Sequence, residues 1–345
     1  MTDVRLEGKW IDMFADVFAL CGVQPGDACA VLCEGGTRPE LPRLAELALQ
    51  RLKAEVFVLT LPSRKLTAPV PVRSTGASEA IGGLEPVVRA LAACTFVADC
   101  TVEGLQHAAE LPRILGGGAR VLAISHEHPE ILERCVPRAG DDVPVREAMR
   151  RLKGAQAMHV TSAAGTDLRV SVTGARIGGV WGYTAKPGTL SHWPAGLVLA
   201  FPAASAVDGV LVMDRGDVNL TFKRYLDAPV RLQIEHDVVT RVEGDGVDAE
   251  LMRGYFAAWN DPAAYAVSHL GWGLNRGARW DAMTFYDKAD FNGTELRAFA
   301  GNFLYSTGAN EVAGRHTAGH FDLPLRGCTV ALDGQVVVDA GRLVE

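Results

Sequence analysis

Residues Ala28–Leu61, ACAVLCEGGTRPELPRLAELALQRLKAEVFVLTL, contain the pattern from which the fold class follows. Two short apolar runs, Ala28–Cys33 and Val56–Leu61, have the length and composition of buried strands. Between them, Leu41–Leu52 places apolar residues at helical spacing. A strand, a helix and a second strand in this order predict a βαβ unit, in which the two strands lie parallel and the helix covers one face of the sheet.

The same alternation continues on both sides of this unit. Further helices are expected at Trp10–Cys21, Val102–Leu115 and Pro129–Cys135, and further strands at Phe96–Ala98 and Arg120–Ile124. The polar segment Arg138–Pro144 contains Asp, Gly and Pro residues, as linkers between domains do. We therefore predict an N-terminal domain over residues 1–150, with an open, mostly parallel α/β sheet.

After about residue 155 the pattern changes to short alternating runs interrupted by Gly, Pro and Asp. Strands are expected at His159–Ser162, Leu168–Val172, Gly209–Met213, Val218–Phe222 and Val230–Ile234. One helix is expected between Gly246 and Asn260, because Val247, Leu251, Tyr255 and Trp259 recur every four residues. A chain of 345 residues exceeds the size of a usual single core, so a second domain is predicted over residues 151–345. This domain is expected to be of the α+β class, to consist mainly of β-strands and to carry the catalytic site.

Composition and charge argue against several classes of function. The formal net charge is −7 and there is no dense Lys/Arg run, so nucleic acid and acidic membranes are not expected partners. No apolar stretch has the length of a signal peptide or of a bilayer-spanning helix, which predicts a cytoplasmic protein. The 7 cysteines, an odd number without paired spacing, predict reduced core thiols and no structural disulfides.

Three residues could together bind a metal ion. His320 and Asp322 lie two apart in a strand-like segment and would project from the same face, although an isolated pair of this kind is a weak signal. His269 lies in the apolar stretch Tyr265–Trp272, where a buried core histidine is the ordinary interpretation. Two imidazoles and one carboxylate form the ligand set that leaves three octahedral positions open on Fe(II) for substrate and O₂.

Other motifs give weaker signals. His316, His192 and His107 are each more often surface or capping residues when taken singly. The turn Cys33–Arg38 follows a strand but lacks both GxGxxG and a Walker-type GK[ST], so no nucleotide cofactor is predicted. No GxSxG segment is present, which argues against a serine hydrolase.

Several segments of the C-terminal half resemble those of the 2,5-dihydroxypyridine 5,6-dioxygenases, a family within the thermophilic-type metalloaminopeptidase superfamily. They are Ser191–Gly196, Asp214–Asp217, Asn260–Asn275, Ala300–Gly308 and His320–Asp322, and Thr101–His107 extends the likeness forwards. The resemblance implies Fe(II) bound by His269, His320 and Asp322. It also implies a homo-oligomer that opens a hydroxylated pyridine, 2,5-dihydroxypyridine, with O₂ to an N-formylmaleamate-type product.

A metal-dependent aminopeptidase or amide hydrolase of the parent superfamily is the main alternative. Those enzymes hold two metals with two Glu, two His and one Asp, and three of these positions are occupied here by Leu197, His269 and Leu304. Only His320 and Asp322 match both branches, so the set for one metal is complete and the set for two is not. Oxygen chemistry is therefore favoured over peptide hydrolysis.

Two further alternatives concern the substrate and turnover. Lys186–His192 departs from the family pattern, which has an acidic residue before Pro-Gly and Arg-Trp-Asp after it, so a dioxygenase for another hydroxylated aromatic ring stays open. A binding or regulatory protein that has lost turnover is the third alternative. The intact metal-ligand set argues against it, because a binding module needs no open metal site.

Candidate catalytic residues come from the matched segments. His192 is the first candidate for a general base that removes a proton from the ring, and His107 is the second. A purely structural role for His192 against Trp193 is an equal alternative, and His107 could instead contact substrate or belong to a lid. Ser306 could orient substrate or oxygen by hydrogen bonding. Arg279 or Arg297 could steer an anionic ring, or be solvated surface charges.

Overall fold

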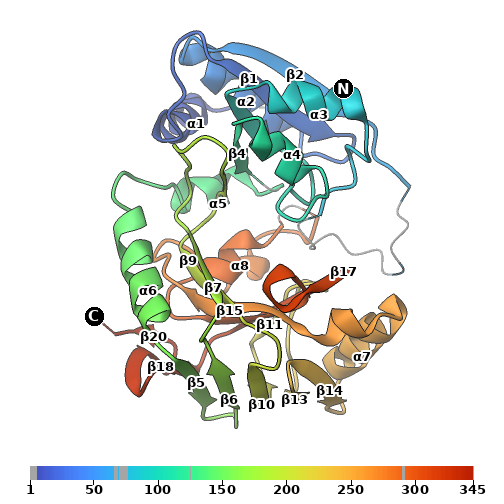
Figure 1. The fold of residues 1–345 in the computed structure, drawn as a ribbon. Helices are drawn as coiled ribbons and strands as arrows, with labels where there is room; N and C mark the ends of the chain where they lie inside the picture. The colour runs from blue at the N-terminus through green and yellow to red at the C-terminus, as the bar shows by residue number, and fades with distance from the viewer. Residues whose placement is uncertain (1–5, 66–68, 70–76, 125, 290–291, 345) are drawn as a thin grey trace.

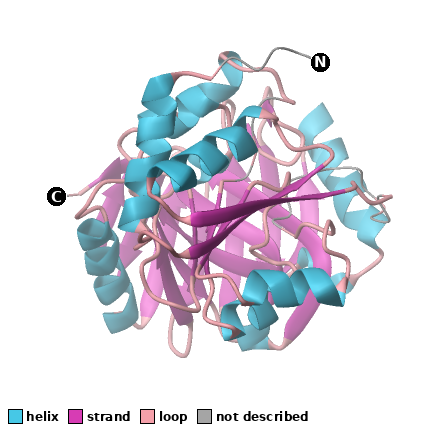
Figure 2. Ribbon diagram, turned by 90° about the horizontal axis from the view of Figure 1, so that it is seen from above, coloured by secondary structure: helices cyan, strands magenta, loops and turns pink. Residues whose placement is uncertain are grey.

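The computed structural model describes residues 6–65, 69, 77–124, 126–289 and 292–344. In Figure 1 the N-terminal half of the chain forms the upper part of the molecule and most of the C-terminal half forms the lower part. Viewed from above, the helices lie around the outside and the strands run through the middle (Figure 2).

Five parallel strands form the described sheet of the N-terminal half, in the order β2-β1-β3-β4-β8. They are β1 (Ala28–Glu34), β2 (Glu55–Leu61), β3 (Phe96–Asp99), β4 (Arg120–Ala123) and β8 (Leu190–His192). Alternate strand residues point to opposite faces. One face packs against α1 (Gly8–Leu20) and α2 (Glu40–Arg51), and the other against α3 (Glu85–Ala92) and α4 (Leu111–Gly116).

Antiparallel sheets make up most of the C-terminal half. An eight-stranded sheet has the order β14-β13-β10-β6-β5-β18-β19-β20, and a five-stranded sheet has the order β17-β16-β15-β9-β7. The first consists of β5 (Ala157–Ser162), β6 (Asp167–Ser171), β10 (Val207–Met213), β13 (Val230–Glu235), β14 (Val238–Glu243), β18 (Cys328–Leu332), β19 (Gln335–Asp339) and β20 (Arg342–Leu343). The second consists of β7 (Arg176–Val180), β9 (Leu197–Phe201), β15 (Val267–Gly273), β16 (Phe303–Asn310) and β17 (Arg315–Leu325).

The remaining elements lie between and beside these sheets. They are the strand pair β11 (Val218–Asn219) and β12 (Arg224–Tyr225), the helices α5 (Pro129–Arg134), α6 (Asp142–Gly154), α7 (Val247–Trp259) and α8 (Thr294–Ala298), and the 3₁₀ turns η1 (Pro262–Tyr265), η2 (Ala282–Thr284) and η3 (Glu311–Ala313). Within the described ranges, no helix is long and apolar enough to cross a membrane.

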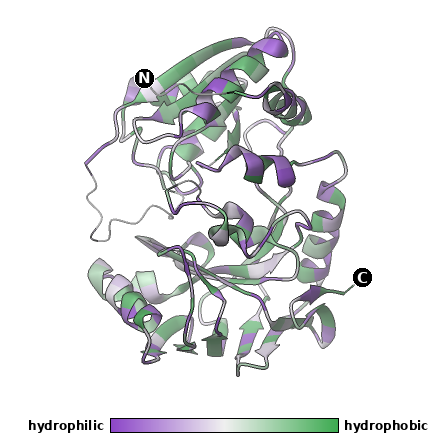
Figure 3. Cartoon of the chain, turned by 180° about the vertical axis from the view of Figure 1, so that it is seen from behind, coloured by the Kyte–Doolittle hydropathy of each residue, from purple (hydrophilic) through white to green (hydrophobic). Residues whose placement is uncertain are grey.

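One hydrophobic core joins the two antiparallel sheets and α7. It contains Leu270 and Trp272 of β15 and Phe321 and Leu323 of β17, together with Tyr255 of α7. The strands are coloured mainly as hydrophobic in Figure 3, whereas the surface helices also carry hydrophilic residues. Because strand residues alternate, the other face of the five-stranded sheet is free to carry polar side chains toward the N-terminal half.

The predicted fold class, a mostly parallel α/β sheet followed by a mainly β half with helices, is confirmed. The parallel sheet nevertheless takes its fifth strand, β8, from the predicted second domain. Trp193, directly after β8, is fully buried in the core of the N-terminal half, where its ring centroid lies 5.1 Å from that of Phe14. The two halves are therefore interlocked, and the boundary at residue 150 stays a prediction.

Three element predictions are wrong in part. The helix expected at Val102–Leu115 is limited to α4, because the buried Asp99 carboxylate accepts the backbone N–H groups of Thr101 and Leu105 and holds that segment in a turn. The strand expected at Val218–Phe222 ends at Asn219, before a turn in which Lys223 has φ 49°.

The third error concerns the expected linker. Helix α6 begins inside Arg138–Pro144, since Pro144 lies in the first helical turn, where its missing N–H has no intrahelical partner to lose. The buried residues Val145, Ala148 and Leu152 have the helical spacing that would have revealed it. Helix α3 was also not anticipated.

A buried ion pair connects α5 with α8. The Arg134 guanidinium donates to both carboxylate oxygens of Glu295, at 3.1 and 2.6 Å, and the Glu295 side chain is 0% exposed. The same carboxylate accepts the backbone N–H of Arg279 at 2.9 Å. The pair therefore fixes α8, which lies next to β17, against α5, which follows β4.

We predict that Arg134→Met lowers the free energy of unfolding by about 3 kcal/mol, because it leaves the Glu295 carboxylate buried without its charge partner. Urea unfolding measures the loss. The control is Arg146→Met, which breaks the Arg146–Asp142 pair, whose side chains are 59% and 25% exposed, and should cost less than about 1 kcal/mol. Equal losses in the two variants would contradict this assignment.

Candidate metal centre

The three predicted metal ligands lie side by side on the five-stranded sheet. His269 of β15 pairs with Ser306 of β16, and Ser306 pairs with Asp322 of β17, so these residues form one row across three strands. His320 lies two residues before Asp322 and therefore projects from the same face. This face is opposite to the one that carries Leu270 and Phe321 into the core.

Their ligand atoms are close enough to share one ion. One nitrogen from each of His269 and His320 and one oxygen of Asp322 all lie within 4.8 Å of one another, and all three residues are buried. The Nε2 atoms of His320 and His269 lie 3.2 and 3.7 Å from Asp322 Oδ1. Among the described residues this is the one group of three or more His, Cys, Asp or Glu side chains with such geometry.

A β-bulge orients His269. The register of β15 and β16 shifts between Val267 and His269, which leaves Ser268 outside the regular pairing. The Ser268 hydroxyl donates to Ala309 O at 2.6 Å and lies 3.1 Å from His269 Nδ1. Because its proton is committed to the carbonyl, the hydroxyl accepts from Nδ1–H, and the lone pair of His269 is left on Nε2, the atom that faces Asp322.

Two further side chains hold the Asp322 carboxylate. Arg297 of α8 donates from Nε to Asp322 Oδ2 at 2.5 Å, and the Ser306 hydroxyl donates to Asp322 Oδ1. Ser306 is fully buried and is not among the residues that line the cavity. Its position fits the orientation of a ligand carboxylate, whereas the sequence suggested a contact with substrate or oxygen.

The charge states of the cluster fit a divalent cation. Burial lowers the pKa of His269 to about 3, although the neighbouring Asp322 carboxylate acts in the opposite direction, so this imidazole is neutral at pH 7. Burial by itself would raise the pKa of Asp322, but His320 and Arg297 outweigh it and hold the pKa well below the usual range. A neutral imidazole and an ionised carboxylate are the protonation states that a metal requires of its ligands.

The cluster opens into a cavity of about 190 Å³. Leu190, Leu197, Leu199, Phe201 and Leu304 give it apolar walls. Its polar lining, besides the three predicted ligands, consists of Glu103, Gln106, His107, His192, Asn292, Thr294 and Arg297.

Both predicted base candidates lie at this cavity. His192 Nδ1 is 2.6 Å from Pro194 O, and since a carbonyl can only accept, Nδ1 carries the proton and Nε2 has the lone pair. The His107 ring centroid lies 5.1 Å from that of His320. His107 also borders an outer hollow lined by Arg64 and Lys65, so it separates the cavity from that hollow.

The remaining predicted residues lie apart from the cavity. Arg279 is exposed and pairs with Asp281 at 2.7 Å, so it does not face the cluster. His316 is exposed on β17 and is not part of the cluster. Glu103, Gln106, Asn292 and Thr294 also line the cavity and were not predicted from the sequence, although Glu103 and Gln106 lie in the matched segment Thr101–His107.

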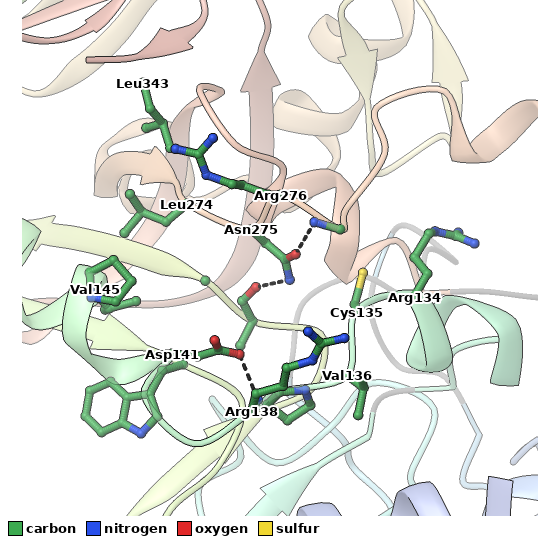
Figure 4. Close-up of a pocket in the computed structure, with 16 residues that line it drawn as sticks. Arg134, Cys135, Val136, Arg138, Asp141, Val145, Leu274, Asn275, Arg276 and Leu343 are labelled. Atoms are coloured by element: carbon green, nitrogen blue, oxygen red, sulfur yellow. Dashed lines mark hydrogen bonds between the residues drawn. The ribbon is translucent and has the colours of Figure 1, made fainter. Parts of the chain in front are cut away.

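Another hollow, of about 510 Å³, is lined in part by the connection from β8 to β9 (Figure 4). Asn275 donates to Ala195 O at 2.7 Å and accepts from Gly277 N–H at 2.9 Å, so its amide ties the loop after β15 to the connection from β8 to β9. Arg138 and Asp141 line this hollow, but no metal-binding group of described residues does. The chemistry therefore belongs to the smaller cavity.

Comparisons with known proteins agree on one family. The sequence profile described as 2,5-dihydroxypyridine 5,6-dioxygenase matches residues 9–345. A 2,5-dihydroxypyridine 5,6-dioxygenase of Pseudomonas putida KT2440 is 38% identical over 336 residues, which cover 96% of this chain and 95% of the relative. The solved structure of the 2,5-dihydroxypyridine dioxygenase from that strain matches with a TM-score of 0.92 and 37% identity, over 99% of this chain and 98% of the other. AmpT from Thermus thermophilus shares the fold, with a TM-score of 0.65 and 14% identity over 98% and 99% of the chains.

Glu127 holds the segment that leads to Arg297. It comes from the end of the parallel sheet, and its Oε1 atom accepts the backbone N–H groups of Gly293 and Thr294 at 3.0 and 2.6 Å. Its Oε2 atom is buried without a hydrogen-bond partner among the described residues. Burial raises the pKa of Glu127 to about 7, which the hydrogen bond from the Thr294 backbone only partly offsets.

We predict that ionisation of Glu127 lowers the free energy of unfolding as the pH rises. Its pKa is raised by folding, from 4.5 to about 7, so its contribution is complete below about pH 4.5 and is lost as the pH rises through about 7. Glu127→Gln keeps an acceptor oxygen but cannot ionise. Its free energy of unfolding, relative to the unmodified protein, should therefore increase by about 3 kcal/mol across that range.

Urea unfolding at a series of pH values measures this difference. The matched control is Glu250→Gln, which replaces an exposed carboxylate of α7 and should give a difference that changes little over the same range. A constant difference between Glu127→Gln and the unmodified protein would disprove the assignment.

Proposed function

The chain belongs to the 2,5-dihydroxypyridine 5,6-dioxygenase family, and we propose that it opens 2,5-dihydroxypyridine with O₂ at one Fe(II) bound by His269, His320 and Asp322. The resemblance inferred from the sequence is confirmed, and the chain is a ring-cleaving dioxygenase. The observation that carries the proposed centre is the approach of three buried ligand atoms to within 4.8 Å at the wall of a small cavity. An N-formylmaleamate-type product is part of the proposal.

The ligand set favours a single iron. Two imidazoles and one carboxylate with open positions are typical of non-haem Fe(II) oxygenases. Leu197 and Leu304, which stand where the resemblance places aminopeptidase ligands, line the cavity with side chains that cannot bind a second metal. Fe(II) in this position would supply electron transfer between an electron-rich ring and O₂.

The cavity itself would select and orient the ring. Its apolar walls exclude water from the reacting atoms, and its volume of about 190 Å³ suits a single six-membered ring with small substituents. Arg297 is committed to Asp322, so we assign to it the orientation of a ligand carboxylate instead of direct contact with an anionic ring.

His192 is the proposed general base. Its Nδ1–H donates to Pro194 O, which leaves the Nε2 lone pair available, and the residue lines the cavity. Burial lowers the pKa of His192 to about 4, so Nε2 is unprotonated at pH 7 and can take a proton from a ring hydroxyl. His107, which also lines the cavity, is the second candidate.

The protein is first loaded with Fe(II) in the absence of air. When O₂ is then admitted, we predict that it consumes O₂ and 2,5-dihydroxypyridine in equal amounts. An oxygen electrode and the loss of ring absorbance measure the two reactants. His269→Ala should abolish both iron binding and O₂ uptake, whereas His316→Ala, on the same strand as His320 but exposed, should keep both. Hydrolysis of a leucyl amide with Zn(II), without O₂ uptake, would replace this proposal by the amide hydrolase alternative.

We predict that His192→Gln lowers kcat/KM about 100- to 10,000-fold, the usual contribution of a general base, while the iron content stays unchanged. Because the pKa of His192 is about 4, activity of the unmodified enzyme should fall only as the pH approaches that value from above, when Nε2 becomes protonated. Steady-state O₂ uptake over pH and metal analysis test both statements. A loss of iron in His192→Gln would assign the residue to the metal centre instead.

A further inference from the structure

Gln106 brings an unsatisfied amide to the cavity. It lines the same cavity as His269, His320 and Asp322. Its Oε1 atom is buried, and no described residue donates a hydrogen bond to it. A buried polar atom without a partner costs about 1–3 kcal/mol, and folded proteins leave few of them. Oε1 lies against Gly104, and a rotation of the amide about its last torsion angle would turn this atom toward a ligand in the cavity, which would supply the missing donor.

The loop around Gln106 is built to hold the amide in place. Asp99 accepts from Thr101 N–H at 3.0 Å, from the Thr101 hydroxyl at 2.6 Å and from Leu105 N–H at 2.7 Å, which fixes the turn. Gly104 has φ 82°, and a Cβ atom there would lie 2.1 Å from Gln106 Oε1. The amide lies over the turn only because residue 104 has no side chain.

The other carboxamide of the cavity is already committed. Asn292 Nδ2 donates to Val102 O at 3.2 Å, and Asn292 Oδ1 accepts from Arg297 at 3.2 Å. Gln106 is therefore the carboxamide that can still recognise a bound molecule.

The chemistry of a primary amide matches one edge of the ring. In its pyridone form, 2,5-dihydroxypyridine presents N1–H, a donor, next to C2=O, an acceptor. A carboxamide offers an acceptor and a donor at the same spacing, so the two can form a pair of antiparallel hydrogen bonds. The C5–C6 bond, which the reaction opens, begins at C6, the other ring neighbour of N1, so hydrogen bonds to N1–H and C2=O leave it uncovered.

We propose that Gln106 recognises the N1–H and C2=O edge of the substrate and so leaves the C5–C6 bond free to face His269, His320 and Asp322. This inference rests on the proposed function and assigns its selectivity for a nitrogen heterocycle to one side chain. A benzene diol lacks N1–H and would leave Oε1 unpaired, and sites built to hydrogen-bond a substrate reject such analogues.

Equilibrium binding without O₂ tests the proposal directly. Dissociation constants are measured for 2,5-dihydroxypyridine and for 1,4-dihydroxybenzene, a ring of the same size without N1–H, with iron-free and iron-loaded protein. Gln106→Met keeps the length of the side chain but removes both hydrogen-bonding groups. Leu199→Met, in the wall of the same cavity, is the matched control.

The expected result is a change of selectivity without a loss of stability. Gln106→Met should bind 2,5-dihydroxypyridine about tenfold more weakly, the loss expected from two hydrogen bonds, and 1,4-dihydroxybenzene as before. Leu199→Met should leave the ratio of the two constants unchanged. The Tm of Gln106→Met should not fall, since the variant removes a buried atom that has no partner.

Two outcomes would overturn the role of Gln106. If Gln106→Met weakens the binding of both ring compounds equally, the ratio of their dissociation constants is unchanged. This result would show that the amide does not recognise N1–H. A lower Tm with unchanged selectivity would make Gln106 a structural residue. O₂ uptake by the unmodified, iron-loaded enzyme is recorded in the same preparation, so failure of the dioxygenase proposal is seen separately from failure of the recognition proposal.

Discussion

The pairing register of β15, β16 and β17 is the constraint on which the metal centre depends. The register sets His269, Ser306 and Asp322 abreast, and a slip of one residue would exchange the two faces of a strand. Such a slip would carry Asp322 into the core and Phe321 out of it. Burial of a large apolar side chain contributes about 2 kcal/mol, so the core on the opposite face holds the ligands in position.

The side of the cavity that faces the metal ligands comes from the parallel sheet. The turn from Asp99 to His107 and strand β8 with His192 both lie at the carboxyl ends of parallel strands, where open α/β sheets place their functional loops. Arg297 links the two halves, because it contacts Asp322 directly and reaches Val102 through Asn292. A displacement of one half relative to the other would therefore change both the ligand carboxylate and the loop that carries Gln106.

Much of this could be predicted from the sequence, for identifiable reasons. The βαβ pattern of Ala28–Leu61 is local, and residues two apart on a strand must share a face, so the fold class and the His320–Asp322 pair followed from spacing. The convergence of His269 with them depends on strand pairing over more than fifty residues, which spacing does not reveal and the family resemblance supplied. Gln106 was missed because its signal is the absence of a partner, a property of the folded loop and not of the sequence.

The fold alone does not determine the reaction. The residues on the cavity face of the five-stranded sheet do. AmpT has a similar fold at 14% identity, so the arrangement of the sheets alone does not specify a reaction. In this chain the cavity face carries His269, and the apolar residues Leu197 and Leu304 line the same cavity, which leaves one set of metal ligands beside an apolar wall. Polar recognition must then come from the loops of the parallel sheet. This separation lets the ring substrate vary through residues such as Gln106 while the strands that hold the metal stay the same.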